Sequence, residues 1–179
     1  MSKTNVAKLL VLAAIVAGTV LLAVLSHRPS APKVGDEAPG FTLVGLRAPS
    51  VSLRDYRRSV VVLNFWATWC LPCVEEMPSL NRFAKAMDGR GVTVIGVSVD
   101  SDLKALEKFV AEGQIAFPIA RDPDQTLAAR YGTFKFPESY LIDAEGRIAE
   151  KLVGAVDWQD PRLIARVQKL ARGSERSAR

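Results

Sequence analysis

The sequence predicts an α/β fold. Two continuous apolar runs rich in β-branched residues, Val60–Phe65 and Val92–Val99, have the length and composition of strands buried on both faces. Each run is followed by a segment with the apolar spacing of a helix, and Gly or Pro stands near most of the junctions. The 179 residues, 49% of them apolar, are enough for one domain with a substantial core.

The first apolar stretch precedes this domain. Leu9–Leu25 holds no charged or strongly polar residue apart from Thr19. As a helix it would measure ~26 Å against ~30 Å of hydrocarbon, so we expect neighbouring residues to join it in a membrane span over residues 6–26. The site Val24-Leu-Ser26 matches the A-x-A cleavage pattern poorly, which favours an uncleaved anchor over a signal sequence. Lys3 and Lys8 place the N-terminus inside and the domain outside the cytoplasmic membrane.

These observations predict four parts. Residues 1–28 are the membrane anchor (or signal sequence), residues 29–33 an extended linker with two prolines, residues 34–172 the domain, and residues 173–179 a basic tail. The formal net charge is +5, but all 19 acidic residues and all but three of the 24 basic residues follow residue 29. The remaining net charge of +2 does not indicate a nucleic-acid partner.

The elements of the domain are predicted in chain order, beginning with a hairpin and the first buried strand. Phe41–Val44 and Val51–Leu53 pair across a turn, and Leu53–Tyr56 forms a second turn before the strand that starts at Val60. A helix then runs from Cys70 to about Met87, and Gly89 and Gly91 end it.

After the second buried strand, a helix capped by Asp100 or Ser101 is expected to bury Leu103, Leu106, Phe109 and Val110. Phe117–Ile119 is a short edge strand because of Pro118, and a helix through Leu127–Tyr131 follows it. Tyr140–Ile142 and Ile148–Val153 form a hairpin across Asp143–Gly146. The last helix starts at Asp160-Pro161, with a buried stripe of Leu163, Ile164, Val167 and Leu170.

The two cysteines, Cys70 and Cys73, flank Leu71 and Pro72 at the start of the first helix. Pro72 suits the first turn, where its missing N–H would have no intrahelical partner. The helix N-terminus lowers the pKa of the Cys70 thiol and favours its thiolate, which would attack a substrate disulfide; Cys73 would resolve the mixed disulfide. A purely stabilising crosslink is the simpler interpretation, although so short a loop would contribute only ~2 kcal/mol. A zinc site has too few ligands, because His27 is the only histidine.

The run from Asn64 to Pro78, Asn-Phe-Trp-Ala-Thr-Trp-Cys-Leu-Pro-Cys-Val-Glu-Glu-Met-Pro, resembles the motif of the TlpA/ResA/CcmG family of membrane-anchored thiol–disulfide oxidoreductases. The resemblance extends from about Val34 to Leu170. It implies a thioredoxin-like fold, a central mixed sheet flanked by helices, with a strand–helix insertion at residues 101–131. It also implies reduction of protein disulfides, such as apocytochrome c haem-site cysteines, on the extracytoplasmic (periplasmic) side of the cell membrane. A transmembrane electron donor would restore the dithiol, and no cofactor beyond the Cys70–Cys73 pair is expected.

The resemblance also implies a substrate-binding region. The family holds a cis-proline beside the active-site sulfurs, and Pro137 after Phe136 takes that position here. The expected contacts with substrate are Trp69, Leu71, Pro72, Phe136 and Pro137. Glu138, after the proline, is similar to the CcmG branch, whereas Glu76-Met-Pro78 resembles ResA and TlpA, so the branch stays open.

A proton acceptor for Cys73 is expected at Glu76. Plain thioredoxins bury an aspartate six residues before the first cysteine, and here that position is Asn64, which cannot titrate. Glu76 lies one helical turn after Cys73 and matches the glutamate of ResA-like proteins. A partly buried carboxyl there would have a raised pKa and could exchange protons near neutrality. The alternative is a surface glutamate, a role for which Glu75 is the better candidate.

Two other functions are weighed. A peroxiredoxin-like peroxidase would need a threonine three residues before the cysteine, where Ala67 stands. A copper-binding assembly factor would favour a wider cysteine spacing and a histidine within the domain. Thiol–disulfide exchange is therefore the leading hypothesis.

Overall fold

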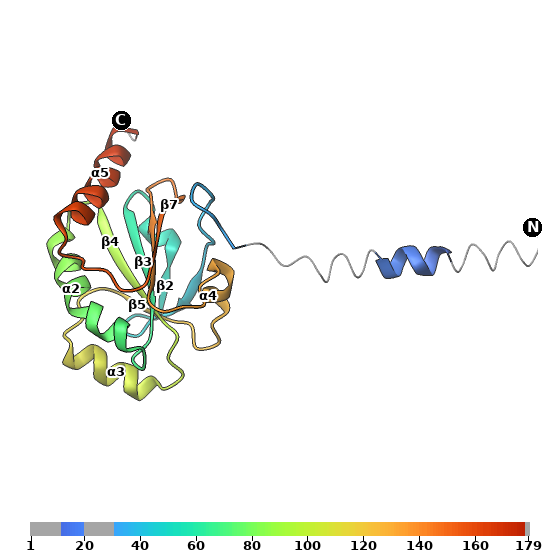
Figure 1. The fold of residues 1–179 in the computed structure, drawn as a ribbon, viewed down its shortest axis with the longest axis horizontal. Coiled ribbons are helices and arrows are strands. Elements are labelled where there is room, and N and C mark those ends of the chain that lie inside the picture. The colour runs from blue at the N-terminus through green and yellow to red at the C-terminus, as the bar shows by residue number, and fades with distance from the viewer. Residues whose placement is uncertain (1–11, 20–30, 178–179) are drawn as a thin grey trace, which may run out of the picture. The chain divides into compact units, whose positions relative to one another are not determined.

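A computed structural model describes residues 12–19 and 31–177, and the chain divides into two units, Met1–Ser30 and Ala31–Arg179 (Figure 1). In the first unit residues 12–19 are helical. The predicted span over residues 6–26 lies mostly outside the described residues. Within the parts of the chain that are described, no helix combines the length and apolar character required to cross a membrane.

The second unit is built on a five-stranded mixed sheet with the strand order β5-β4-β3-β6-β7. Its strands are β3 (Val60–Trp66), β4 (Val92–Ser98), β5 (Ile119–Arg121), β6 (Glu138–Ile142) and β7 (Ile148–Val153). The first three run parallel, while β6 pairs antiparallel with β3 and β7 antiparallel with β6. The prediction of a mixed sheet is confirmed, and β5 is an edge strand, shifted slightly beyond Pro118.

Four helices accompany this sheet: α2 (Leu71–Met87), α3 (Leu103–Glu112), α4 (Thr126–Tyr131) and α5 (Pro161–Ser177). In Figure 1, α2 and α5 lie on one side of the sheet and α4 on the other. Together, α3, β5 and α4 occupy the expected insertion, residues 101–131. The final helix reaches Ser177, past Arg172, where the sequence suggested that the domain gives way to a tail.

The core is centred on β3, in which all seven residues are buried. Strands on both of its edges satisfy its backbone and helices cover its faces, which is why a continuous apolar run is stable there. From α5, Leu163 and Val167 are buried against it as predicted, and Ile164 and Leu170 pack against it half-buried. Gly96 of β4 is required at the centre, because an added Cβ would lie 3.0 Å from the Trp66 indole nitrogen and 2.8 Å from Ile119.

A separate hairpin of β1 (Thr42–Val44) and β2 (Ser50–Ser52) precedes the main sheet, followed by the 3₁₀ helix η1 (Leu53–Tyr56). The pairing is antiparallel, with Leu43 opposite Val51, as the sequence predicts. The β6–β7 hairpin also forms where it was expected, across a turn at Asp143–Gly146 in which the Gly146 N–H donates to the Asp143 carbonyl.

The predicted cap of α3 is wrong. The N-cap is Asp102, whose carboxylate accepts the N–H groups of Lys104 and Ala105, and neither Asp100 nor Ser101 fills that role. The helix therefore begins later than expected, and Leu103 lies 38% exposed in its first turn instead of on the buried face. Asp100 is unavailable as a cap because its carboxylate is bound to the loop that precedes α2.

Candidate active site

The two cysteines stand where β3 leads into α2. Cys70 is the N-cap residue, Pro72 lies in the first turn, and Cys73 is inside the helix. A disulfide joins Cys70 to Cys73, with their Cα atoms 5.2 Å apart. The Cys73 N–H donates to Cys70 Sγ at 3.3 Å, so one of the helix's free N–H groups is directed at this sulfur.

Burial distinguishes the two sulfurs. Cys70 is 7% exposed and Cys73 only 1%, so the residue at the helix N-terminus is the more accessible of the pair. When the bond is reduced, the same N–H and the helix dipole favour negative charge on Cys70. The arrangement is therefore suited to a Cys70 nucleophile and a Cys73 resolving thiol, the assignment that the sequence predicts.

Asp100 holds the loop between β3 and Cys70, a role that sequence reasoning missed. Its buried carboxylate accepts the Thr68 N–H at 3.1 Å, the Thr68 hydroxyl at 2.6 Å and the Ser98 hydroxyl at 2.7 Å. Its position directly after a buried strand could have indicated this role. Because β3 and β4 are parallel, their carboxyl ends meet at one edge of the sheet. A polar residue after β4 therefore reaches the loop after β3.

An apolar surface adjoins the disulfide. Trp69 and Leu71, on either side of Cys70, are 64% and 67% exposed, and Pro72 is also exposed. The Trp69 ring meets the half-buried Phe136 ring edge-on, with centroids 6.0 Å apart. Thus Trp69 lies at the surface, whereas Trp66 is wholly in the core. Phe134, which the sequence analysis did not single out, is 79% exposed in the same loop as Phe136.

The loop before β6 reaches the same edge of the sheet. The peptide bond between Phe136 and Pro137 is cis, as the resemblance implies. Because Glu138 pairs with Phe65 near the end of β3, this bond lies at the end of the sheet from which the chain continues to Cys70. The Pro137 carbonyl accepts the Gly154 N–H at 2.9 Å, which ties the loop to the segment after β7.

Glu76 is buried within α2, with 5% of the residue exposed, whereas Glu75 is exposed as expected. Oε1 accepts the indole N–H of Trp158, and Oε2 has no hydrogen-bond partner among the described residues. Burial raises the pKa of this carboxyl from 4.5 to about 7, although the Trp158 indole and the Val156 backbone oppose the rise. The sequence indicated Glu76 but not Trp158; a lone Trp before the last helix gave only a weak signal.

Two other buried polar residues lie on the sheet. The Asn64 amide N–H donates to the Ser139 hydroxyl at 2.9 Å, whereas Asn64 Oδ1 has no hydrogen-bond partner among the described residues. The Glu138 carboxylate lies 3.2 Å from the Lys151 ammonium, and the Tyr140 hydroxyl is also within hydrogen-bond distance. Glu138 is thus paired with a cation, whereas within the described part of the chain no salt bridge involves Glu76.

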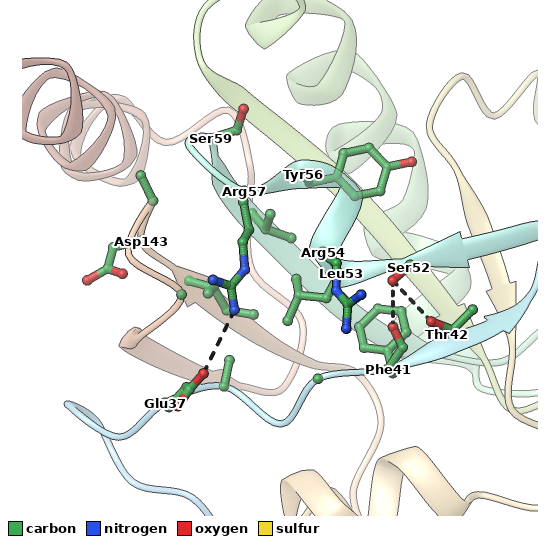
Figure 2. A pocket seen from close by; sticks show the side chains of 16 residues that line it. Glu37, Phe41, Thr42, Ser52, Leu53, Arg54, Tyr56, Arg57, Ser59 and Asp143 are labelled. Carbon is green, nitrogen blue, oxygen red and sulfur yellow. Dashed lines mark hydrogen bonds and ion pairs between the residues drawn. The ribbon is translucent and has the colours of Figure 1, made fainter. Parts of the chain in front are cut away.

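A cavity of about 400 Å³ lies at the opposite end of the sheet from the disulfide (Figure 2). Ser59, before β3, and Asp143, after β6, contribute to its wall. Arg57 extends across it toward Glu37, 4.0 Å away. None of the predicted site residues lines it, so this cavity is separate from the cysteine pair.

A thioredoxin-like domain with a paired-cysteine centre at a helix N-terminus belongs to the class of thiol–disulfide exchange proteins. Residues 34–151 match the AhpC/TSA family, and the chain belongs to that family.

The similarity to particular proteins points to the same activity. The chain is 36% identical over 122 residues to "Thiol-disulfide oxidoreductase ResA" of Bacillus thuringiensis (strain Al Hakam), covering 68% of this chain and 70% of that one. It is 35% identical over 152 residues to the ResA protein of Geobacillus thermodenitrificans, and the match covers 85% of this chain and 86% of that one. A crystal structure of a DsbE-type thiol:disulfide interchange protein from Chlorobium tepidum superposes with a TM-score of 0.74 at 32% identity, covering 79% of this chain and 99% of that one. The protein is a thiol–disulfide oxidoreductase of the ResA/DsbE type.

Proposed function

We propose that this oxidoreductase works outside the cytoplasmic membrane as a reductant of protein disulfides, such as those of apocytochrome c haem-site cysteines. A transmembrane electron donor restores its dithiol. The observation that carries the proposal is the Cys70 sulfur, which belongs to the less buried cysteine of the pair and accepts a helix N–H beside an exposed apolar surface. No cofactor is needed beyond the Cys70–Cys73 pair.

The exchange balances in two steps. The Cys70 thiolate attacks one sulfur of the substrate disulfide, forming a mixed disulfide and releasing the other sulfur as a thiolate. Cys73 then loses its proton and attacks Cys70, which forms the Cys70–Cys73 disulfide and frees the second substrate sulfur. Two electrons pass to the substrate, and its two thiolates take up protons.

The roles of the cysteines are tested by trapping. Cys73→Ser should accumulate mixed disulfides with substrate because the resolving thiol is gone, whereas Cys70→Ser should abolish turnover. Non-reducing electrophoresis of both variants with an oxidised Cys-X-X-Cys-His peptide measures this. Equal trapping by the two variants would contradict the assignment.

The direction of exchange is tested by a redox titration of the full chain against glutathione or dithiothreitol buffers. A midpoint near that of thioredoxin, about −270 mV, is expected for a reductant. A midpoint near −120 mV, typical of a strong oxidant such as DsbA, would contradict the proposed direction.

Substrate recognition is assigned to Trp69, Leu71, Pro72, Phe136 and Pro137, and we add Phe134. Trp69, Leu71, Pro72 and Phe134 are exposed and offer contact area that a protein substrate would bury, whereas Phe136 is half-buried and Pro137 is buried. Trp69→Ala should slow reduction of an oxidised Cys-X-X-Cys-His peptide about tenfold while leaving reduction of glutathione disulfide nearly unchanged. Val44→Ala is the control, because Val44 is 62% exposed on β1, outside this surface. Equal losses with both substrates would contradict a docking role.

Glu76 is proposed to accept the Cys73 proton during the resolving step. Its burial on the same helix and its pKa of about 7 support this role. Glu76→Gln should slow exchange and lower the thiol pKa, because a neighbouring carboxylate raises it. If the thiol alkylation rates of wild type and Glu76→Gln were the same at every pH, Glu76 would not be the proton acceptor, and the proton would have to go to water.

The membrane assignment rests on the apolar residues 6–26 and on Lys3 and Lys8. The full chain should sediment with membranes, and a protein lacking residues 1–29 should not, while keeping its cooperative thermal transition. A cysteine-labelling reagent that does not cross membranes should reach the reduced site in intact cells. Protection of the site until lysis would contradict the extracytoplasmic location.

A further inference from the structure

Trp158 contacts Glu76, the proposed proton acceptor of the exchange reaction. It lies in the segment between β7 and α5, is fully buried, and packs against Phe83 of α2 with ring centroids 5.3 Å apart. Its indole N–H donates to Glu76 Oε1, and its own backbone N–H lies 3.4 Å from the Ser79 hydroxyl. Trp158 therefore contacts α2 through one aromatic ring pair and two hydrogen bonds.

The chemistry of an indole makes this contact one-directional. The Trp nitrogen is only a donor, so it cannot accept a proton from the carboxyl. The oxygen that faces it must act as the acceptor in both protonation states of Glu76. The other oxygen, Oε2, is buried and has no partner among the described residues. The carbonyl oxygen of a neutral carboxyl is a better acceptor than its hydroxyl oxygen, so the indole N–H favours a neutral Glu76 with its proton on Oε2.

We propose that Trp158 is a positioning residue for the exchange reaction: by holding Oε1, it makes Oε2 the oxygen that receives and returns the Cys73 proton. This inference rests on the proposed role of Glu76. In the resolving step the Cys73 thiol gives its proton to the Glu76 carboxylate, so that a neutral carboxyl and a Cys73 thiolate result. The thiolate electrons then form the bond to Cys70.

Two groups lower the pKa of Glu76 against the effect of burial, the Trp158 indole with the larger influence and the Val156 backbone with the smaller. On α2 itself, the titratable groups nearest in sequence are Cys73 and the exposed Glu75. The sequence of β3 contains Asn64, which does not titrate, and no acid or base, and β4 likewise contains no acid or base. The segment that carries Trp158 also contains Asp157, which is exposed, and Asp160, which pairs with Arg162.

The test compares four full-length reduced proteins: wild type, Trp158→Phe, Glu76→Gln and the double variant. The measurement is the pH dependence of disulfide exchange with glutathione disulfide. Trp158→Phe removes a donor that favours the carboxylate, so the Glu76 inflection should move upward by about one pH unit. In the Glu76→Gln background the same replacement should leave the profile unchanged. Phe83→Leu is the matched control, because it removes the ring contact and keeps the N–H; its inflection should equal that of wild type.

Three results would overturn the inference. An unshifted inflection in Trp158→Phe, with Glu76→Gln still altered, overturns the role of Trp158 and leaves that of Glu76 standing. A shift in Phe83→Leu equal to that in Trp158→Phe assigns the effect to packing. A Glu76→Gln profile identical to wild type overturns both the inference and the proposed proton acceptor.

A measurement on the unaltered protein covers the case in which Trp158→Phe fails to fold. The indole N–H resonance of Trp158 and the Glu76 Cδ resonance should titrate together, with one midpoint near pH 7, because ionisation of the carboxyl strengthens this hydrogen bond. An indole resonance that stays constant while the Cδ resonance titrates would overturn the inference.

Discussion

Two buried carboxylic acids adjoin α2, and they are partnered in opposite ways. Asp100, which follows β4, receives the Thr68 N–H and two hydroxyl groups, so both of its oxygens are engaged. Glu76, within the helix, has one oxygen bound by Trp158, and the other has no hydrogen-bond partner in the part of the chain that the structure describes. A fully engaged carboxylate is suited to holding a loop in one conformation. A carboxyl with one free oxygen and no cation is suited to exchanging a proton, so the same functional group serves two purposes.

The largest effect should follow from removing the engaged acid. Asp100→Ala leaves the Thr68 N–H and two hydroxyl groups without their acceptor, and we expect a loss of about 4 kcal/mol in the free energy of unfolding. Chemical denaturation of the oxidised protein measures it. A loss below about 1 kcal/mol would show that the loop before Cys70 does not depend on Asp100.

The second effect concerns the pH dependence of the free energy of unfolding, to which Glu76 contributes. The folded protein holds this proton up to about pH 7, whereas the unfolded chain releases it near its ordinary pKa of 4.5. The folded state therefore binds more protons between these values, and stability falls as pH rises through this window, by about 3 kcal/mol in total. Glu76→Gln should remove this part of the slope. A variant with the full wild-type slope between pH 4.5 and 7 would mean that other groups cause it.

A smaller effect is expected from withdrawing a single donor from Asp100. Thr68→Val keeps the backbone N–H and the shape of the side chain but removes the hydroxyl that lies 2.6 Å from Oδ1. The loss should be about 1.5 kcal/mol, less than half of that for Asp100→Ala. If the two variants were equally destabilised, the hydroxyl alone would account for the role of Asp100.

The smallest effect should come from the neighbouring glutamate. Glu75 is exposed on the same helix, so Glu75→Gln should change stability by less than about 0.5 kcal/mol and leave the pH profile of exchange as in wild type. Denaturation and exchange kinetics, run beside Glu76→Gln, test this. A shift comparable to that of Glu76→Gln would mean that charge near the helix N-terminus matters more than burial.

Local patterns in the sequence were sufficient for the main elements and for the cysteine pair. The β-branched run of β3 and the spacing of α5 predict buried faces, and Cys-Leu-Pro-Cys at a helix start predicts an N-capping sulfur, because these features depend on residues close in sequence. The choice of Glu76 over Glu75 as the partly buried acid came from its spacing from Cys73 together with the resemblance to ResA-like proteins.

What only the tertiary structure decided are the contacts between distant segments. Trp158 meets Glu76 across 82 residues, and Asp100 meets Thr68 across 32. The sequence predicted Asp100 or Ser101 as the cap of α3. An aspartate carboxylate accepts N–H groups equally well at a helix N-cap and in a neighbouring loop, so residue type alone does not distinguish the two. Sequence periodicity reports which face of an element is apolar, but not which polar atom of another element will meet it. That choice depends on the sheet order β5-β4-β3-β6-β7, which brings the carboxyl ends of β3 and β4 and the start of β6 to one edge, where Cys70 lies.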